Sequence, residues 1–370
     1  MTRKKRIVVI SAIAVVAVLL ATAIVFAGLG IANAVKMQPK EPLAYNGPRQ
    51  NVILMIGDGM VPNHLLAAEG KFGEMFMTSA PVKGYAVTDS RNLFGPTDSA
   101  ASATALSTGH KVYNGNVGWY RGEDLLSTTE IAQSLQMSTA VLATEGVDGA
   151  TPAGFSAHTS SRTNPDEILA DQLASKVDVF LGSNRARYTE KQVEIRAAGF
   201  TYLESLPETL PANERIFGSF DEVFLQDSPT TPTLARMSTL TIEKLNTNPN
   251  GFFMMIEESH IDKCSHDNRL SDALDHVLAY DRTIRAVVEL AEQIGNTVVI
   301  VTADHETGGL QYDSRPADEY SDDMYTVGHH TEANVPYFIF GDLHGLQVPA
   351  VIDNTQIAML CQSILQAKQD

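Results

Sequence analysis

The feature that most constrains the fold is a series of short apolar runs that alternate with amphipathic segments. The runs are "NVILMI" (51–56), "TAVLAT" (139–144), "VDVFL" (177–181), "FFMMI" (252–256), "TVVIV" (297–301) and "PYFIF" (336–340). Their length and branched side chains suit strands that are buried on both faces. Segments of helical periodicity lie between and after them, at 127–136, 165–175, 233–245, 271–293 and 354–367. This alternation predicts an α/β domain, a three-layer α/β/α sandwich around a mostly parallel sheet.

The N-terminal segment has a different composition. Basic residues at 3–6 precede residues 7–35, which contain no charged side chain. A bilayer-crossing helix needs about 20 apolar residues, so this run is long enough. A cleavable signal peptide is the alternative, since "ANA" at 32–34 resembles a cleavage site, although the apolar region of such peptides is normally about 7–15 residues long. We expect an uncleaved membrane anchor at 1–35, a linker at 36–50 and a globular domain at 51–370.

The charge distribution predicts on which side of the membrane this domain lies and which ligands its surface disfavours. Basic residues before the apolar run favour a cytoplasmic N-terminus, with the domain outside the membrane, in the periplasm or the extracellular space, or secreted if the segment is cleaved. The net charge is −17, and without Arg3, Lys4, Lys5 and Arg6 it becomes −21. Such a surface does not favour nucleic acid, and it repels anionic substrates unless bound cations reverse the field locally.

Acidic side chains follow several of the apolar runs. Asp58 comes after the first run, Glu257 after "FFMMI", and Asp304 with His305 after "TVVIV". One such residue is commonly a turn former or a helix cap. Parallel strands, however, bring these residues to one edge of the sheet, where ligands bind. Because carboxylates repel one another there unless cations are present, the pattern indicates a metal centre.

Two further segments supply metal-ligand types. Asp262 and His266 have i, i+4 spacing, and His329 and His330 precede the last apolar run. Mixed Asp and His ligands favour zinc, whereas a carboxylate with a hydroxyl and waters favours magnesium. The remaining histidines are interpreted as surface or core residues: His64, His110, His158, His260, His276 and His344. Only two cysteines are present, Cys264 and Cys361, so there is no disulfide scaffold, and their pairing is left open.

The stretch "GPTDSAASATAL" (95–106) surrounds Ser99 with small side chains. Taken alone, it fits either a closely packed helix or a nucleophile at a helix start.

Six motifs resemble those of the alkaline phosphatases, in the order of that family: "GDGM" (57–60), "TDSAASATAL" (97–106), "TPAGFSAHTSSR" (151–162), "EESHIDKCSH" (257–266), "VTADHETGG" (301–309) and "HTEANVP" (330–336). The resemblance covers roughly residues 50 to 365. A single motif of this kind is weak, but six in order are specific.

The resemblance implies two zinc ions and one magnesium ion. It assigns Asp262, His266 and His330 to the first zinc, Asp58, Asp304, His305 and the Ser99 oxygen to the second, and Asp58, Thr151 and Glu257 to magnesium. His330 is chosen over His329 because it precedes the threonine of the family pattern. Ser99 is then the nucleophile at a helix N-terminus, and Arg162 grips two phosphate oxygens.

The implied reaction is hydrolysis of phosphate monoesters through a phosphoserine, with net retention at phosphorus. A phosphodiesterase or sulfatase of the same superfamily, and a non-catalytic metal- or phosphate-binding membrane protein, are the alternatives. Homodimers are frequent in the family. Gly149 departs from the pattern, because the family has Asp or His there, so either Asp148 or water is expected to substitute. Lys263 matches a lysine near the phosphate in some members.

Overall fold

The computed structural model describes residues 38–221, 225, 228 and 230–369. The chain divides into two units, 1–39 and 40–370, and everything below concerns the second. The expected membrane segment at 7–35 lies outside the described residues. Among the helices that are described, none has the length and apolar character that crossing a membrane requires.

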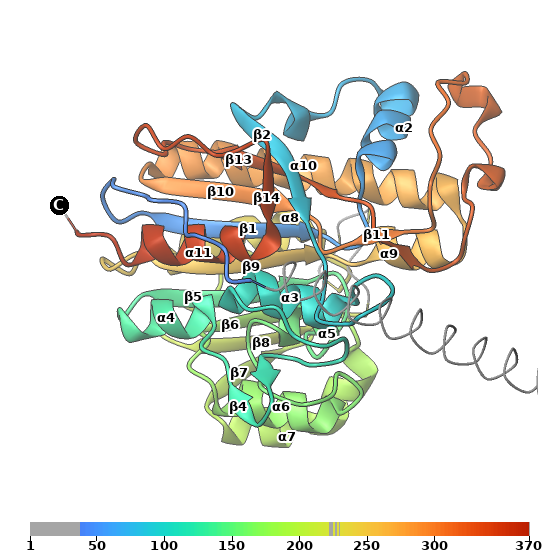
Figure 1. Ribbon diagram of the computed structural model, residues 1–370. Helices are drawn as coiled ribbons and strands as arrows, with labels where there is room; N and C mark the ends of the chain where they lie inside the picture. The colour runs from blue at the N-terminus through green and yellow to red at the C-terminus, as the bar shows by residue number, and fades with distance from the viewer. Residues whose placement is uncertain (1–37, 222–224, 226–227, 229, 370) are drawn as a thin grey trace, which may run out of the picture. The chain divides into compact units, whose positions relative to one another are not determined.

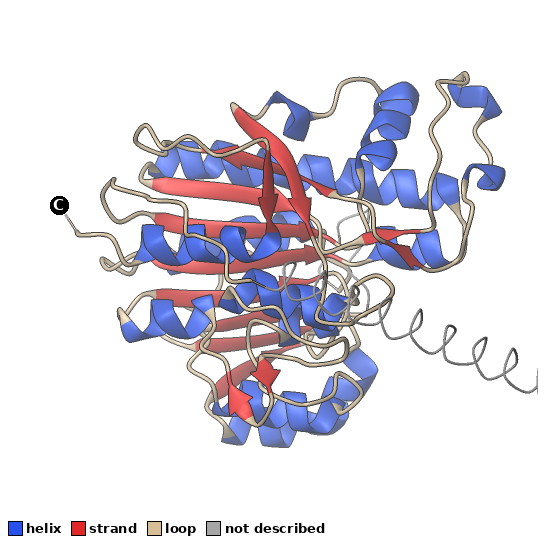
Figure 2. Ribbon diagram, in the orientation of Figure 1, coloured by secondary structure: helices blue, strands red, loops and turns tan. Residues whose placement is uncertain are grey.

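Within the described residues, ten strands form one sheet (Figures 1 and 2). Their spatial order is β14 (Val351–Asp353), β2 (Val82–Val87), β13 (Val335–Phe340), β10 (Thr297–Thr302), β1 (Asn51–Gly57), β9 (Phe252–Glu258), β5 (Ser138–Ala143), β6 (Val179–Gly182), β8 (Arg215–Ser219) and β7 (Phe200–Leu203). Every neighbouring pair is parallel except those of β13, which runs antiparallel to β10 and β2. The predicted α/β class and mostly parallel sheet are confirmed.

Burial explains why these strands could be predicted from the sequence. All residues of β1, β9 and β10 are buried, as a sheet covered on both faces requires. Each of the six apolar runs is a strand, with boundaries within two residues of those expected. In contrast, β2 has mostly half-buried or exposed positions and includes Lys83 and Gly84, so it presents no continuous apolar run.

The helices form two groups that pack against the sheet (Figure 1). One group contains α3 (Ser99–Thr108), α4 (Thr128–Ser134), α5 (Ala150–Ala153) and α11 (Asn354–Leu365). The other contains α2 (Pro62–Phe72), α8 (Leu234–Leu245), α9 (His260–His266) and α10 (Leu270–Ile294). Contacts between helices join members of the same group. In Figure 1, α3 and α11 lie in front of the sheet and α8 and α10 lie behind it.

The remaining elements are short or lie toward the β7 edge. They are α6 (Pro165–Ala174), α7 (Arg185–Ala197), η1 (Phe76–Ser79), η2 (Ala317–Glu319), η3 (Asp322–Met324) and the two-stranded pairs β3 (Trp119–Tyr120) with β4 (Glu123–Asp124) and β11 (Glu306–Thr307) with β12 (His330–Thr331). The two cysteines are buried free thiols, which answers the open question of their pairing.

Candidate active site

The carboxyl ends of three adjacent strands bring the acidic residues together. β1 lies between β9 and β10, and its Ile56 pairs with Glu257 on one side and with Thr302 on the other. Asp58 and Asp304 therefore leave the sheet beside Glu257. The structure thus brings these acidic residues together at the carboxyl ends of the strands, as the sequence pattern predicted.

A glycine allows the loop after β1 to approach α9. Gly59 has φ +75°, and a Cβ atom there would lie 2.8 Å from the Cα of Asp262. A side chain would thus be strained by the backbone and blocked by its neighbour. The close approach brings Asp58 next to the helix that carries Asp262.

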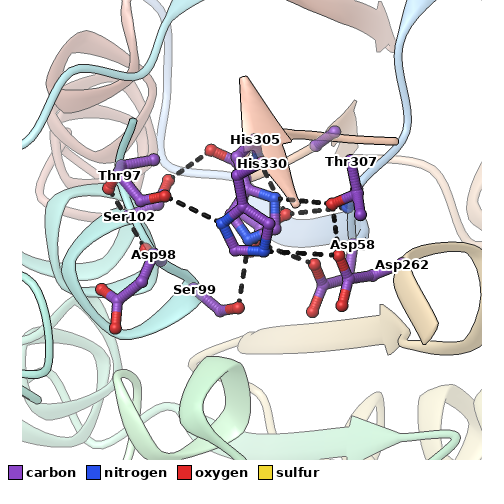
Figure 3. A network of polar contacts seen from close by, with 12 residues as sticks. Asp58, Thr97, Asp98, Ser99, Ser102, Asp262, His305, Thr307 and His330 are labelled. Atoms are coloured by element: carbon purple, nitrogen blue, oxygen red, sulfur yellow. Dashed lines mark hydrogen bonds and ion pairs between the residues drawn. The ribbon is translucent and has the colours of Figure 1, made fainter. Parts of the chain in front are cut away.

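The four residues expected around the second zinc lie together. The Nε2 atom of His305 is 3.5 Å from Asp58 Oδ1 and 3.2 Å from Asp304 Oδ2. The same nitrogen is 3.1 Å from the Oγ of Ser99 (Figure 3). Asp58, Asp304 and His305 form a group that could hold a metal ion.

The three residues expected around the first zinc also converge. Asp262 Oδ1 lies 3.4 Å from His266 Nε2 and 3.6 Å from His330 Nε2, and the two Nε2 atoms are 3.1 Å apart. The other ring nitrogen of His330 is 3.0 Å from the carbonyl of Thr97, a contact that turns Nε2 toward the site (Figure 3). His329 is exposed and points elsewhere, with its Nδ1 on the carbonyl of His330.

Several buried oxygen atoms of the site have no hydrogen-bond partner among the described residues. They are Asp58 Oδ1, Asp304 Oδ2, both carboxylate oxygens of Glu257 and the hydroxyl of Thr151. A buried polar atom without a partner costs about 1–3 kcal/mol. Because oxygen donors of this type bind divalent cations, the residues fit the metal ions that the sequence implies.

The pKa shifts point in the same direction. Burial raises the pKa of Asp58 well above its usual 3.8, and the negative charges of Asp304, Asp262 and Glu257 raise it further. Burial also raises the pKa of Glu257 well above 4.5, with Glu145 and Asp304 adding to the effect. Bound cations would offset both causes.

The imidazole of His305 is held in its neutral form. Burial is the main cause that lowers its pKa well below 6.5, and the positive charge of a protonated His330 would lower it further. A neutral imidazole is the form that binds a metal ion.

Ser99 is the first residue of α3, and Asp98 is the N-cap. One Asp98 oxygen accepts a hydrogen bond from the backbone of Ala101 at 2.9 Å. The other accepts from the Gly115 backbone at 3.0 Å and from Arg162 Nη1 at 3.3 Å. One carboxylate thus fixes the start of the helix and holds Arg162 beside Ser99.

The small side chains after Ser99 serve packing as well. Every residue of α3 is buried, and the helix contacts α5 and α11. Gly154 after α5 lies so close that a Cβ there would be 2.7 Å from the Cβ of Ala103. The two interpretations of this stretch are therefore compatible, because close packing carries the helix start to the site.

The position of Gly149 is filled by Glu145. A Cβ at residue 149 would lie 2.4 Å from Glu145 Oε1, so the Glu145 carboxylate takes the space of a side chain there. Glu145 also forms an ion pair with Lys263. Asp148 turns away, and its carboxylate contacts Arg187 Nε at 2.7 Å and accepts a hydrogen bond from Tyr188.

Sequence reasoning missed both Glu145 and Thr307. Thr307 donates a hydrogen bond to Asp262 and lies 3.3 Å from His305 Nδ1 (Figure 3). Its only signal was its place two residues after His305. Glu145 offered no signal, since its role depends on the course of the loop after β5.

Comparisons with known proteins agree with this geometry. A sequence model of the family described as alkaline phosphatase matches residues 49–199 and 216–339. Alkaline phosphatase 4 of Bacillus subtilis is 33% identical over 332 residues, which cover 80% of this chain and 69% of that protein. Alkaline phosphatase 3 of the same organism is 31% identical, with 70% and 62% covered. The chain thus spans about two thirds of the length of these relatives.

Solved structures give the same result. Alkaline phosphatase from the Antarctic bacterium TAB5 superposes with a TM-score of 0.73 at 28% identity, covering 87% of this chain and 100% of that one. A mutant of that enzyme, solved with Mg bound, has a TM-score of 0.74.

Proposed function

The chain belongs to the alkaline phosphatase family, and from this premise we propose that it hydrolyses phosphate monoesters to an alcohol and inorganic phosphate. One observation carries the proposal. The Ser99 hydroxyl lies at the N-terminus of α3, 3.1 Å from the imidazole of His305 and beside the carboxylates of Asp58 and Asp304. A serine so placed can serve as a nucleophile.

The family uses metal ions, and we propose two zinc ions and one magnesium ion here. Asp262, His266 and His330 would hold the first zinc. Asp58, Asp304, His305 and Ser99 would hold the second, and Asp58, Thr151 and Glu257 the magnesium. When bound, such cations lower the pKa of coordinated hydroxyl groups and water and balance the charge of phosphate. The buried oxygens without hydrogen bonds support this assignment.

The chain's own residues bind and turn over the ester. The Ser99 oxygen attacks phosphorus, a bond from Oγ to phosphorus forms, and the bond to the ester oxygen breaks. The departing oxygen takes up one proton, which balances the proton that the Ser99 hydroxyl gives up, and leaves as alcohol. Water then forms a bond to phosphorus and gives up a proton, the bond from phosphorus to Oγ breaks, Oγ regains a proton, and inorganic phosphate leaves. Two inversions predict net retention at phosphorus.

The start of α3 and the side chain of Arg162 stabilise the anionic phosphoryl group. The backbone N–H groups at the start of the helix and its dipole favour an anion next to Ser99. Arg162 can donate two hydrogen bonds to phosphate oxygens. Its side chain is 37% exposed, so it reaches an incoming substrate.

Glu145 is proposed to replace the side chain that Gly149 lacks. Its carboxylate lies in that space, pairs with Lys263 and acts on the pKa of Glu257. Glu145 would then be the acidic side chain next to the magnesium site. Asp148 cannot take this role, because its carboxylate contacts Arg187 and Tyr188.

The location of the enzyme stays a proposal from the sequence. We propose that residues 7–35 anchor the protein with its catalytic domain outside the membrane, periplasmic or extracellular. We also propose a homodimer, because homodimers are frequent in the family.

The decisive test uses the full chain with p-nitrophenyl phosphate, bis-p-nitrophenyl phosphate and p-nitrophenyl sulfate. We expect a strong monoester preference that chelation abolishes and zinc with magnesium restores. A diester or sulfate preference would overturn the substrate class and the role of Arg162.

A serine pair tests the nucleophile. Ser99→Ala is expected to lower kcat by at least about 10³-fold with unchanged zinc content, because it removes the attacking oxygen. Ser107→Ala, on the same buried helix, is the control and keeps its activity. A phosphorylated peptide containing Ser99, trapped by acid quenching and absent from the Ser99→Ala variant, would support the covalent step. Full turnover by Ser99→Ala would overturn it.

A further inference from the structure

A second cluster of ligand-type side chains lies apart from the proposed active site. It consists of Glu258, His260 and His276. Glu258 is the last residue of β9, His260 is the first residue of α9, and His276 belongs to α10. Consecutive side chains of a strand point to opposite faces of a sheet, so Glu258 faces α10 while Glu257 faces Thr151 of α5.

The distances in this cluster match those between the ligands of one ion. Glu258 Oε1 is 3.4 Å from His260 Nδ1 and 3.3 Å from His276 Nδ1. Ligand bonds to zinc are about 2.0–2.1 Å long, and in a tetrahedral site neighbouring ligand atoms are then about 3.3–3.4 Å apart. Both Nδ1 atoms therefore lie within 3.4 Å of the same carboxylate oxygen.

One of these nitrogens is buried without a hydrogen bond. His276 is only 7% exposed, and its Nδ1 has no hydrogen-bond partner among the described residues. The nitrogen lies 3.3 Å from Glu258 Oε1. A metal ion shared with the carboxylate would satisfy that nitrogen.

The surroundings leave room to complete a coordination shell. The Thr144 hydroxyl lies 3.3 Å from Glu258 Oε1 and 3.1 Å from His260 Nδ1. Glu258 and His276 line a cavity of about 320 Å³ together with Thr144, Asp275 and Arg282. Water can therefore reach the cluster as a fourth ligand.

We propose that Glu258, His260 and His276 bind a zinc ion that is separate from those of the active site. Two imidazole nitrogens with one carboxylate favour zinc over magnesium, which prefers oxygen ligands. The ion would tie the end of β9 and the start of α9 to α10. Since α9 also carries Asp262 and His266, this zinc would hold in place the helix that supplies ligands to the active site. Its role is structural and does not depend on the proposed phosphatase reaction.

Metal counting on the full chain tests the proposal. The wild type, His276→Gln and His260→Gln are dialysed against buffered Zn²⁺ with excess Mg²⁺, and bound zinc per chain is measured. Each variant is expected to hold one zinc fewer than the wild type. His110→Gln is the control, because it removes a histidine outside the cluster. Equal zinc content in the wild type and both variants would overturn the proposal.

A second measurement covers variants that do not fold. Anomalous diffraction at the zinc edge from wild-type crystals is expected to show a peak between Glu258 and His276, and no peak there would overturn the site. The test is also separable from the active-site proposal. Failure of the active-site zinc assignment lowers the total zinc of every protein alike, whereas failure of this proposal removes the difference between wild type and variants.

Discussion

Glu257 and Glu258 are consecutive and both buried, yet their surroundings are opposite. Glu257 faces other carboxyl groups, and its oxygens lack hydrogen bonds among the described residues. Glu258 faces two imidazoles and the Thr144 hydroxyl. The strand alternates its side chains between the two faces, so a shift of one residue decides which neighbours a buried carboxylate meets. The Glu257 face gathers carboxyl groups, whereas the Glu258 face adds imidazole nitrogens to its carboxylate.

The largest expected effect is a change in the sign of the pH dependence of the free energy of unfolding when metals are removed. Asp58 and Glu257 have raised pKa values in the folded chain, so above about pH 4 the native state holds protons that the unfolded state has released. In chelated protein the free energy of unfolding should therefore fall as pH rises through the raised pKa values. With zinc and magnesium it should rise over the same range, because the ions bind ionised carboxylates.

Urea unfolding from pH 4 to pH 8, with EDTA or with metals, measures this slope. The same sign in both conditions would show that Glu257 and its neighbours do not need cations.

The two glutamates should respond oppositely to neutralisation in chelated protein at pH 8. Glu257→Gln should raise the free energy of unfolding by about 1–3 kcal/mol, because it removes a buried carboxyl group whose ionisation the burial and the neighbouring carboxylates disfavour. Glu258→Gln should lower it by a similar amount, since the two imidazoles lose an ionised partner. Chemical unfolding of the three proteins gives the values. Changes of the same sign would contradict the comparison of the two faces.

A smaller effect is expected from the residue that fills the space at Gly149. Glu145→Gln should raise the Mg²⁺ dissociation constant about tenfold, or about 1.4 kcal/mol, because it weakens the charge beside Glu257. Asp148→Asn is the matched control and should change it by less than about twofold, or roughly 0.4 kcal/mol, since Asp148 faces Arg187. Calorimetric titration of zinc-loaded protein with Mg²⁺ measures both. A larger shift in Asp148→Asn would reverse the assignment.

The smallest effect concerns an imidazole–carboxylate pair nearer the surface. His158 Nε2 lies 3.1 Å from Glu130 Oε1, and this hydrogen bond raises the pKa of His158 to about 9. Its stabilisation should be complete below about pH 6.5 and be lost as pH rises through about 9. Because the pair is partly exposed, we expect less than about 1 kcal/mol.

The His158→Gln variant should lack this part of the pH dependence in thermal unfolding. An unchanged profile would show that the pair contributes nothing, in contrast to the buried Glu258.

The sequence revealed features that depend on local pattern. The central strands are continuous apolar runs, and Asp58, Glu257 and Asp304 follow them directly, so topology alone brings these carboxylates together. Strand β2, which lies next to the edge strand β14, was missed because it has no apolar run.

Features that depend on tertiary packing could not be predicted. Glu145 reaches the space at Gly149 only through the course of its loop. His260 and His276 were interpreted as isolated histidines, because only the packing of α9 against α10 makes them neighbours.

The reversed direction of β13 has a consequence for where a ligand can be encoded. In the parallel strands the polypeptide exits toward the site, so their functional residues lie at the end of the strand or just after it. In β13 it enters from that side: Tyr337 is paired with Thr302, next to the end of β10, and the strand then runs away from the site. His330 accordingly precedes its strand, joined to it by residues 331–334. A search of similar sheets for ligands should therefore look downstream of forward strands and upstream of reversed ones.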